Sequence, residues 1–422
     1  MKKILIILII GGLLSIWYAQ PVWSGEVDIL VEKLVEKRIL TQKEADEILK
    51  EIKKEAAKER AEVIEETKEA ITKGENGVKL VKLPEWIQKT QLKGDFRLRY
   101  QMNDRKGRPD RHRGRYRLRL GLETEIADNI KVAFGLATGS SAPRSTNQSF
   151  TDSFDTPDIR LEYAYVKYTP FKWAELIGGK MKNPIWRPTG LLWDTDIHPE
   201  GGAAKFNWKL HSNLSLFINT GIFVLDERSG DVQDPIMYAL QPGFNWKINN
   251  KTQLKSALVY YGFSNVEGTT LDHSSDTNTL RNGVLKYDYD SFGAGTELGF
   301  KNPFSTNIPY FALMGDYIIN LDPSSDNEGF LLGWKLGHKK VKEKGQWQIG
   351  YWFKRLERDS WLDIFPDADH YGGETSAKTH NVALKYGLEK NVDLGIKYFY
   401  AEKIHDNNEP ENLLQVDLQF NF

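Results

Sequence analysis

Residues 411–422 read Glu-Asn-Leu-Leu-Gln-Val-Asp-Leu-Gln-Phe-Asn-Phe. From Leu414 to Phe422, apolar residues alternate one by one with polar residues. Successive side chains of a β-strand point to opposite faces of a sheet, so this period of two predicts a strand with one apolar and one polar face. A strand of this kind fits either a soluble sandwich or a barrel in lipid.

The same alternation returns along the chain from residue 89 onward. It is clear over residues 115–122, 346–353 and 392–400. The pattern predicts about sixteen antiparallel strands, with an uncertainty of about two. The expected strands lie near residues 90–101, 114–126, 129–138, 158–169, 173–181, 201–209, 213–224, 235–248, 251–262, 286–301, 307–320, 328–341, 345–357, 377–388, 391–402 and 411–422.

The connections between these strands alternate in length. Short turns lie near residues 127–129, 248–251 and 389–391, whereas long loops cover 102–113, 139–157, 182–200, 263–285 and 358–376. Short turns that alternate with long loops, at an even strand count, indicate an all-β transmembrane barrel of the outer-membrane type. Such a barrel must close, because an open edge would leave backbone groups unpaired in hydrocarbon. We expect the short turns to face the periplasm.

The composition excludes several other classes of protein. The 422 residues include no cysteine, so a disulfide scaffold, a thiolate metal site and a cysteine nucleophile are excluded. With 57 basic and 58 acidic residues, the chain has no overall basic character that would favour nucleic-acid binding. The eight histidines show no metal-ligand spacing and there is no Gly-x-Ser-x-Gly motif. The sequence therefore predicts neither an enzyme nor a cofactor or metal.

The first 82 residues have a different character from the rest. Lys2 and Lys3 precede an apolar run over residues 4–17, and Val22 and Ser24 stand where a signal peptidase reads, so 1–24 is predicted to be a signal peptide. An uncleaved anchor helix is the alternative. Residues 25–82 show apolar positions at helical spacing and predict a periplasmic coiled-coil-like stalk and linker, or else a solvated single helix. The barrel is expected over 89–422.

These features together resemble a known family. An export signal, a short charged helical segment, about sixteen amphipathic strands and the terminal Phe422 are similar to the bacterial putative porins, relatives of the general and phosphate-selective porins. The ending with Phe420 and Phe422 resembles the signal read by the barrel-assembly machinery. The resemblance implies a homotrimeric, water-filled channel for small hydrophilic solutes or ions. Outer-membrane lipid and lipopolysaccharide are its expected surroundings.

Arginines occupy the polar face of the first two expected strands. Residues 97–119 contain ten basic and two acidic side chains. We call six of them the arginine ladder: Arg97, Arg99, Arg113, Arg115, Arg117 and Arg119. An arginine in the lipid mid-plane costs about 2–4 kcal/mol, so the ladder is predicted to line the lumen, where it would favour anions. The alternative is that acidic residues inside the barrel pair with these arginines and remove the selectivity.

The connection over residues 182–200 is apolar where an exposed loop should be polar, with Trp186, Leu191, Leu192 and Trp193. In the family that the chain resembles, the third external loop folds inward and narrows the pore. We expect this loop to do the same, or else to pack on a neighbouring subunit. The predicted constriction residues are Arg187, Asp194, Asp196 and Glu200, with Lys180 and Lys182 as further pore-lining residues.

Two further features leave alternatives open. Acidic residues in the other outer loops, including Asp359, Asp363, Asp367 and Asp369, are interpreted as solvated charge, and the alternative is that they hold divalent cations that bridge to lipopolysaccharide. An anion-leaning diffusion porin is the predicted function, and a structural tether whose helical stalk contacts the cell wall is the alternative. An outer-membrane hydrolase would need a Ser/His constellation on the lipid-facing side, and the sequence shows none.

Overall fold

The computed structural model describes residues 84–151, 153–230, 233–304, 307–405 and 409–422, together with residues 41 and 50. The predicted signal peptide (1–24) and helical segment (25–82) lie outside the described residues apart from those two positions. In the described part of the chain, no helix is both long enough and apolar enough to cross a membrane.

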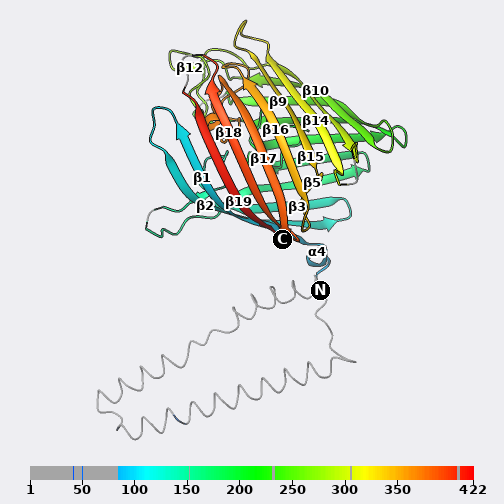
Figure 1. Ribbon diagram of the computed structural model, residues 1–422. Coiled ribbons are helices and arrows are strands. Elements are labelled where there is room, and N and C mark those ends of the chain that lie inside the picture. The colour runs from blue at the N-terminus through cyan, green and yellow to red at the C-terminus, as the bar shows by residue number, and fades with distance from the viewer. Residues whose placement is uncertain are drawn as a thin grey trace, which may run out of the picture. The chain divides into compact units, whose positions relative to one another are not determined.

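The described chain forms one closed antiparallel sheet of sixteen long strands, which confirms the predicted barrel (Figure 1). The strands are β1 (Gln91–Arg105), β2 (Arg111–Ala127), β3 (Ile130–Ala137), β5 (Arg160–Phe171), β6 (Ala174–Lys180), β7 (Glu200–Lys209), β8 (Leu214–Val224), β9 (Ile236–Lys247), β10 (Thr252–Ser264), β13 (Ser291–Lys301), β14 (Tyr310–Asn320), β15 (Glu328–Gly337), β16 (Trp347–Leu356), β17 (Ala377–Glu389), β18 (Val392–Lys403) and β19 (Glu411–Asn421). Short elements accompany them: α4 (Glu85–Gln88), β4 (Gln148–Ser149), β11 (Leu280–Arg281), β12 (Val284–Leu285) and the 3-10 helix η2 (Tyr371–Gly373).

The barrel closes where its first and last strands meet. Strand β1 pairs with β2 on one side and with β19 on the other, and Figure 1 shows β19 between β1 and β18. Gly94 and Phe422 exchange backbone hydrogen bonds of 2.8 and 3.0 Å at the seam. The ring of Phe420 lies 6.2 Å from that of Phe96, and the Phe422 side chain is exposed. Both predicted assembly-signal residues therefore lie on the outer wall at the closing seam.

The first hairpin is longer than expected. Strand β1 continues to Arg105 and β2 begins at Arg111, so the long loop predicted at 102–113 is only the turn 106–110. Residues 101–105 contain one apolar residue, Met102, among polar ones, so their sequence alone gives a weak strand signal. As a result, Arg105, Arg111 and Arg113 lie on strands rather than in a loop.

The outer wall has the features of a lipid-facing surface. Leu98, Leu118 and Leu120 are exposed on β1 and β2. Near the turn end, the rings of Trp173 and Phe171 stack at 5.1 Å, and Trp173 also stacks with Trp208 at 5.9 Å. Exposed aromatic side chains at one end of a barrel wall are typical of the membrane–water interface.

The lumen contains an apolar core, which the sequence did not predict. Inward residues of the strands from β7 to β16, including Phe223, Tyr261 and Ile318, pack against three long loops. The loops contribute Trp193, and with it Val266, Leu271, Tyr289, Trp361 and Phe365. This core occupies the lumen beside those strands, and a separate cavity lies along the wall of β1, β2, β18 and β19.

Two buried carboxylates join the long loops 265–290 and 357–376, contrary to their interpretation as solvated charge. Asp363 is 1% exposed and accepts hydrogen bonds from Ser274 Oγ (2.8 Å) and from the backbone N–H of Thr277 (2.7 Å). Asp359 accepts hydrogen bonds from Thr279 N–H and Oγ1 at 2.7 and 2.6 Å. A buried carboxylate is stable when hydrogen bonds replace its water, and here the donors come from the opposite loop.

Candidate functional site

The arginine ladder is built by the register of the first hairpin. Arg97 lies opposite Arg117 and Arg99 lies opposite Arg115, while Gln101 faces Arg113 and Asp95 faces Arg119. Side chains of directly opposite residues point to the same face of a sheet. Because the intervening leucines are on the outer wall, the ladder points into the lumen.

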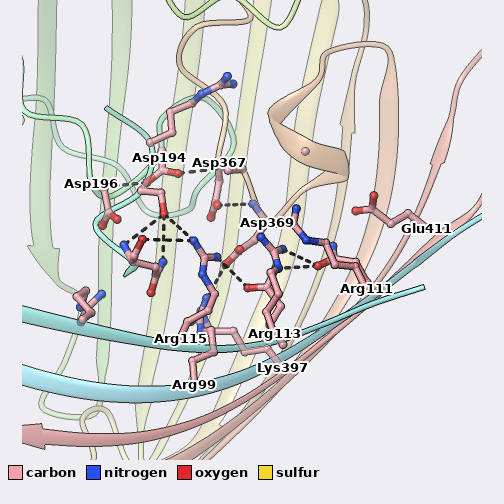
Figure 2. Close-up of a pocket in the computed structure, with 18 of the residues that line it drawn as sticks. Arg99, Arg111, Arg113, Arg115, Asp194, Asp196, Asp367, Asp369, Lys397 and Glu411 are labelled. Carbon is pink, nitrogen blue, oxygen red and sulfur yellow. Dashed lines mark hydrogen bonds and ion pairs between the residues drawn. The ribbon is translucent and has the colours of Figure 1, made fainter. Parts of the chain in front are cut away.

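Five of the six ladder arginines, all except Arg119, line an outer cavity of about 700 Å³. Figure 2 shows the arginines of β1 and β2 facing Asp194, Asp367 and Asp369, which come from the loops 181–199 and 357–376. Ten basic side chains line the cavity: Arg97, Arg99, Arg105, Arg108, Arg111, Arg113, Arg115, Arg117, Arg144 and Lys397. Six acidic side chains do so as well: Asp194, Asp196, Asp367, Asp369, Glu374 and Glu411. The lining therefore has a surplus of basic groups.

Three ladder arginines are held by carboxylates. Arg99 makes a bidentate contact with Asp417, at 2.6 Å from Nε and 2.8 Å from Nη2. The Nη2 atom of Arg117 lies 2.5 Å from Asp95. Arg119 contacts Asp196 and also lies 3.0 Å from Glu162. Bidentate and charge-assisted contacts of this kind fix a guanidinium and neutralise its charge.

Two ladder arginines have only neutral partners. Arg113 donates to the Asn103 side-chain oxygen at 2.8 Å, and Arg115 donates to the Gln101 side-chain oxygen at 3.1 Å. Among the described residues, neither has a carboxylate within 4.0 Å. Arg97 is intermediate, with Asn147 at 2.5 Å and Asp417 at 3.8 Å. Within the ladder, the positive charge that no carboxylate balances is therefore concentrated on Arg113 and Arg115.

The loop 181–199 folds into the barrel and is fixed on both sides. Gln241 of β9 accepts from the backbone N–H of Trp186 and donates to its carbonyl, both at 2.8 Å. Thr189 hydrogen-bonds to Asp316 of β14. The ring of Trp193 lies 4.3 Å from that of Phe365, in the loop 357–376. These hydrogen bonds and the aromatic contact together hold the loop inside the lumen.

This loop separates the outer cavity from an inner one of about 420 Å³. Thr195 lines both cavities. The ion pairs of Arg117 with Asp95 and of Arg119 with Asp196 each join a residue of the outer cavity to one of the inner cavity. We call these two pairs the candidate constriction.

The other predicted site residues divide between the lumen and the outer wall. Asp194 and Asp196 line the outer cavity, whereas Lys182 and Arg187 line the inner one. At Lys180 and Glu200 the structure differs from the prediction. They pair with each other at 2.6 Å, and Glu200 is opposite Val224, whose side chain is exposed on the outer wall. Alternation along β6 and β7 directs both away from the lumen.

Sequence reasoning missed the carboxylates that neutralise the ladder. Asp95 precedes Arg97 by two residues and could have been found from strand alternation. Asp417 lies on the polar face of the last strand, and closure of the barrel alone brings it to Arg99. Asp367 and Asp369 lie in a loop whose inward path the sequence does not specify.

The two aspartates of the loop 181–199 have opposite electrostatic environments. Burial, together with the nearby carboxylate of Asp367, raises the pKa of Asp194 well above its usual range. Burial also acts on Asp196, but Arg119 and Arg117 outweigh it and hold the pKa of Asp196 below its usual range. Asp194 is therefore protonated at neutral pH. Asp196 is ionised and forms the ion pair with Arg119 at the candidate constriction.

Replacing Asp194 by asparagine is expected to remove a pH dependence from the contact between the loops 181–199 and 357–376. Asp194 accepts from the backbone N–H of Ala368 (3.3 Å), and its own N–H donates to Phe365 (2.7 Å). A solvated aspartate loses its proton above about pH 4, whereas the docked one retains it. The docked state therefore binds more protons and loses stability as the pH rises from about 4 toward the raised pKa.

Limited proteolysis of the two loops, between about pH 5 and about pH 9, measures this effect. Cleavage of the unmodified protein should increase with pH throughout this range, whereas cleavage of Asp194→Asn should level off above about pH 6, the value to which burial raises the pKa of the neighbouring Asp367. Equal pH profiles for both proteins would show that another group controls the contact.

The comparisons with known proteins agree with the fold. The chain matches the family model described as "Putative porin" over residues 103–294 and 285–422. Among solved structures it is similar to OprB of Pseudomonas putida, with 11% identity and a TM-score of 0.54, over 80% of this chain and 96% of that one. It also matches the outer-membrane channel DcaP of Acinetobacter baumannii (13% identity, TM-score 0.46, 79% and 97% coverage). A triple mutant of the Rhodopseudomonas blastica porin matches as well (12%, 0.43, 79% and 100%). No curated protein matches the chain.

Proposed function

The chain belongs to the family described as putative porins, and from this premise we propose that it is an outer-membrane channel for the passive diffusion of small hydrophilic anions. The observation that supports anion preference most directly is the pair Arg113 and Arg115. Both face the outer cavity, and among the described residues both have only neutral hydrogen-bond partners. Fixed positive charge in a lumen concentrates anions and repels cations.

The path that we propose follows the wall of β1 and β2. An anion enters the outer cavity, exchanges part of its hydration shell for the guanidinium groups of Arg113 and Arg115, and then reaches the candidate constriction. There the charges of Arg117 and Arg119 are already balanced by Asp95 and Asp196, so the anion is held less strongly and can leave. Beyond the loop, Lys182 and Arg187 line the inner cavity and receive it.

The proposed orientation places the short turns and the N-terminal segment in the periplasm and the long loops outside the cell. The outward leucines and the aromatic stack near the turn end support a wall embedded in outer-membrane lipid. Lipopolysaccharide next to the long loops, insertion by the barrel-assembly machinery and a homotrimeric assembly complete the proposal. Family membership favours a channel over an enzyme.

Single-channel recording of the refolded full-length protein in planar bilayers tests this function. We expect discrete ohmic steps. A variant lacking residues 25–82 should give steps of the same size, because both cavities are lined by residues beyond position 90. If circular dichroism shows a folded barrel and no steps occur, the channel proposal fails and the tether is favoured.

A further inference from the structure

A third cavity, which we call the lysine basin, lies at the turn end of the barrel. Its volume is about 980 Å³. It is lined by five lysines: Lys247 and Lys301 at the ends of β9 and β13, Lys251 in the β9–β10 connection, and Lys339 and Lys340 in the β15–β16 connection. Within the described residues, no acidic side chain lines it. Five like charges thus converge on one space from separate segments.

Three lysines elsewhere near the turn end have carboxylate partners. Lys131 lies 3.4 Å from Glu123, Lys344 lies 3.0 Å from Glu389, and Lys385 lies 3.0 Å from Asp393. In the part of the chain that the structure describes, the lysines of the basin have no carboxylate within 4.0 Å. Within the described residues no carboxylate offsets their mutual repulsion, and a ligand with several negative charges would relieve it.

Amide side chains complete the lining of the basin. Asn213, Asn250 and Asn302 line it, and their side-chain amides have no hydrogen-bond partner among the described residues. An amide both donates and accepts, as a sugar hydroxyl does, whereas an ammonium group only donates and attracts anions as a point charge. The combination of amides and lysines matches a ligand that has hydroxyl groups and carboxylates together.

We propose that the lysine basin binds a short segment of a carboxylated glycan, with its carboxylates on the lysines and its hydroxyls on the asparagines. The volume lies near the upper end of the ~300–1,000 Å³ that is typical of ligand sites, which suits an oligosaccharide better than a single small ion. In the proposed orientation the basin opens toward the periplasm. The site lies apart from the arginine ladder, since the two cavities share no lining residue among those described.

Titration calorimetry of the refolded full-length protein with trigalacturonate tests this proposal. We expect binding that weakens as salt rises. The double variant Lys301→Ala/Lys339→Ala should weaken it about tenfold or more, because two charge-assisted contacts to the carboxylates are lost. Asn250→Ala/Asn302→Ala should weaken it by a smaller factor. Lys344→Ala is the matched control on the β15–β16 connection, because Lys344 already pairs with Glu389, and it should bind normally.

Neutral maltotriose and inorganic tripolyphosphate identify which chemistry the basin recognises. Maltotriose should bind at least about tenfold more weakly than trigalacturonate, because it lacks the carboxylates. Tripolyphosphate binding that is as tight, with no effect of the asparagine variant, would overturn the glycan and leave a plain anion site. No binding of trigalacturonate would overturn the site altogether. An Arg113→Gln/Arg115→Gln variant should retain trigalacturonate binding, so failure of the basin and failure of the anion channel are distinguishable.

Discussion

Replacing Arg113 and Arg115 together by glutamine should lower the anion-to-cation permeability ratio about tenfold. Unit charges 4 Å apart interact by about 1 kcal/mol in water and about 4 kcal/mol near a protein surface. Two guanidinium groups without carboxylate partners therefore readily supply the ~1.4 kcal/mol that a tenfold change requires. Glutamine retains donors toward Asn103 and Gln101, so the wall should remain folded. The reversal potential of each variant in a KCl gradient measures the change.

The matched control removes a neutralised arginine together with its carboxylate. In Arg117→Gln/Asp95→Asn, one positive and one negative charge disappear, so the net charge of the lumen is unchanged. Its selectivity should stay close to that of the unmodified protein, although its conductance can change because the pair stands at the candidate constriction. An equal loss of selectivity in both variants would contradict the distinction between paired and unpaired arginines.

Replacing Asp359 and Asp363 together by alanine should release the loops 265–290 and 357–376 from the lumen. The substitution leaves partly buried donors on Ser274, Thr277 and Thr279 without acceptors. Each orphaned donor costs about 1–3 kcal/mol, so the docked loops should lose roughly 3 kcal/mol or more. We expect larger single-channel steps and new protease cleavage in both loops, with the barrel strands intact by circular dichroism.

Asp272→Asn is the control for this experiment, since Asp272 is an exposed side chain in one of the same loops. It should leave both the step size and the cleavage pattern unchanged. If the double variant conducts like the unmodified protein and resists cleavage, the apolar contacts of Trp361 and Phe365 alone hold the loops. The buried carboxylates would then have no role in keeping the lumen narrow.

The sequence predicted the barrel well because lipid imposes a simple rule on each strand. Outward residues must be apolar whatever their neighbours are, so the alternation in 411–422 or around Tyr116 identifies a strand without knowledge of its partners. The same alternation assigned the arginine ladder to the lumen. The hairpin register of β1 and β2 then needs only the position of the turn 106–110.

What the sequence could not predict depends on contacts between distant segments. Arg99 and Asp417 are 318 residues apart and meet only because the barrel closes. The apolar core inside the barrel arises where β8 is apolar on both faces, as in Ile222, Phe223 and Val224. The same three apolar residues could equally form the end of an ordinary strand that faces lipid, so the sequence alone does not reveal the core. The prediction that Lys180 and Glu200 line the pore rests on their position beside the loop 181–199, whereas strand alternation directs both side chains outward.

The reversal potential of the unmodified protein in a planar bilayer under a salt gradient tests the central claim most directly. The account predicts discrete steps and a reversal potential of the sign set by anion permeation, which becomes smaller as salt screens the ladder. A reversal potential of the opposite sign would show that the carboxylates of Asp367, Asp369 and their neighbours outweigh Arg113 and Arg115. The anion-selective path along β1 and β2 would then be wrong.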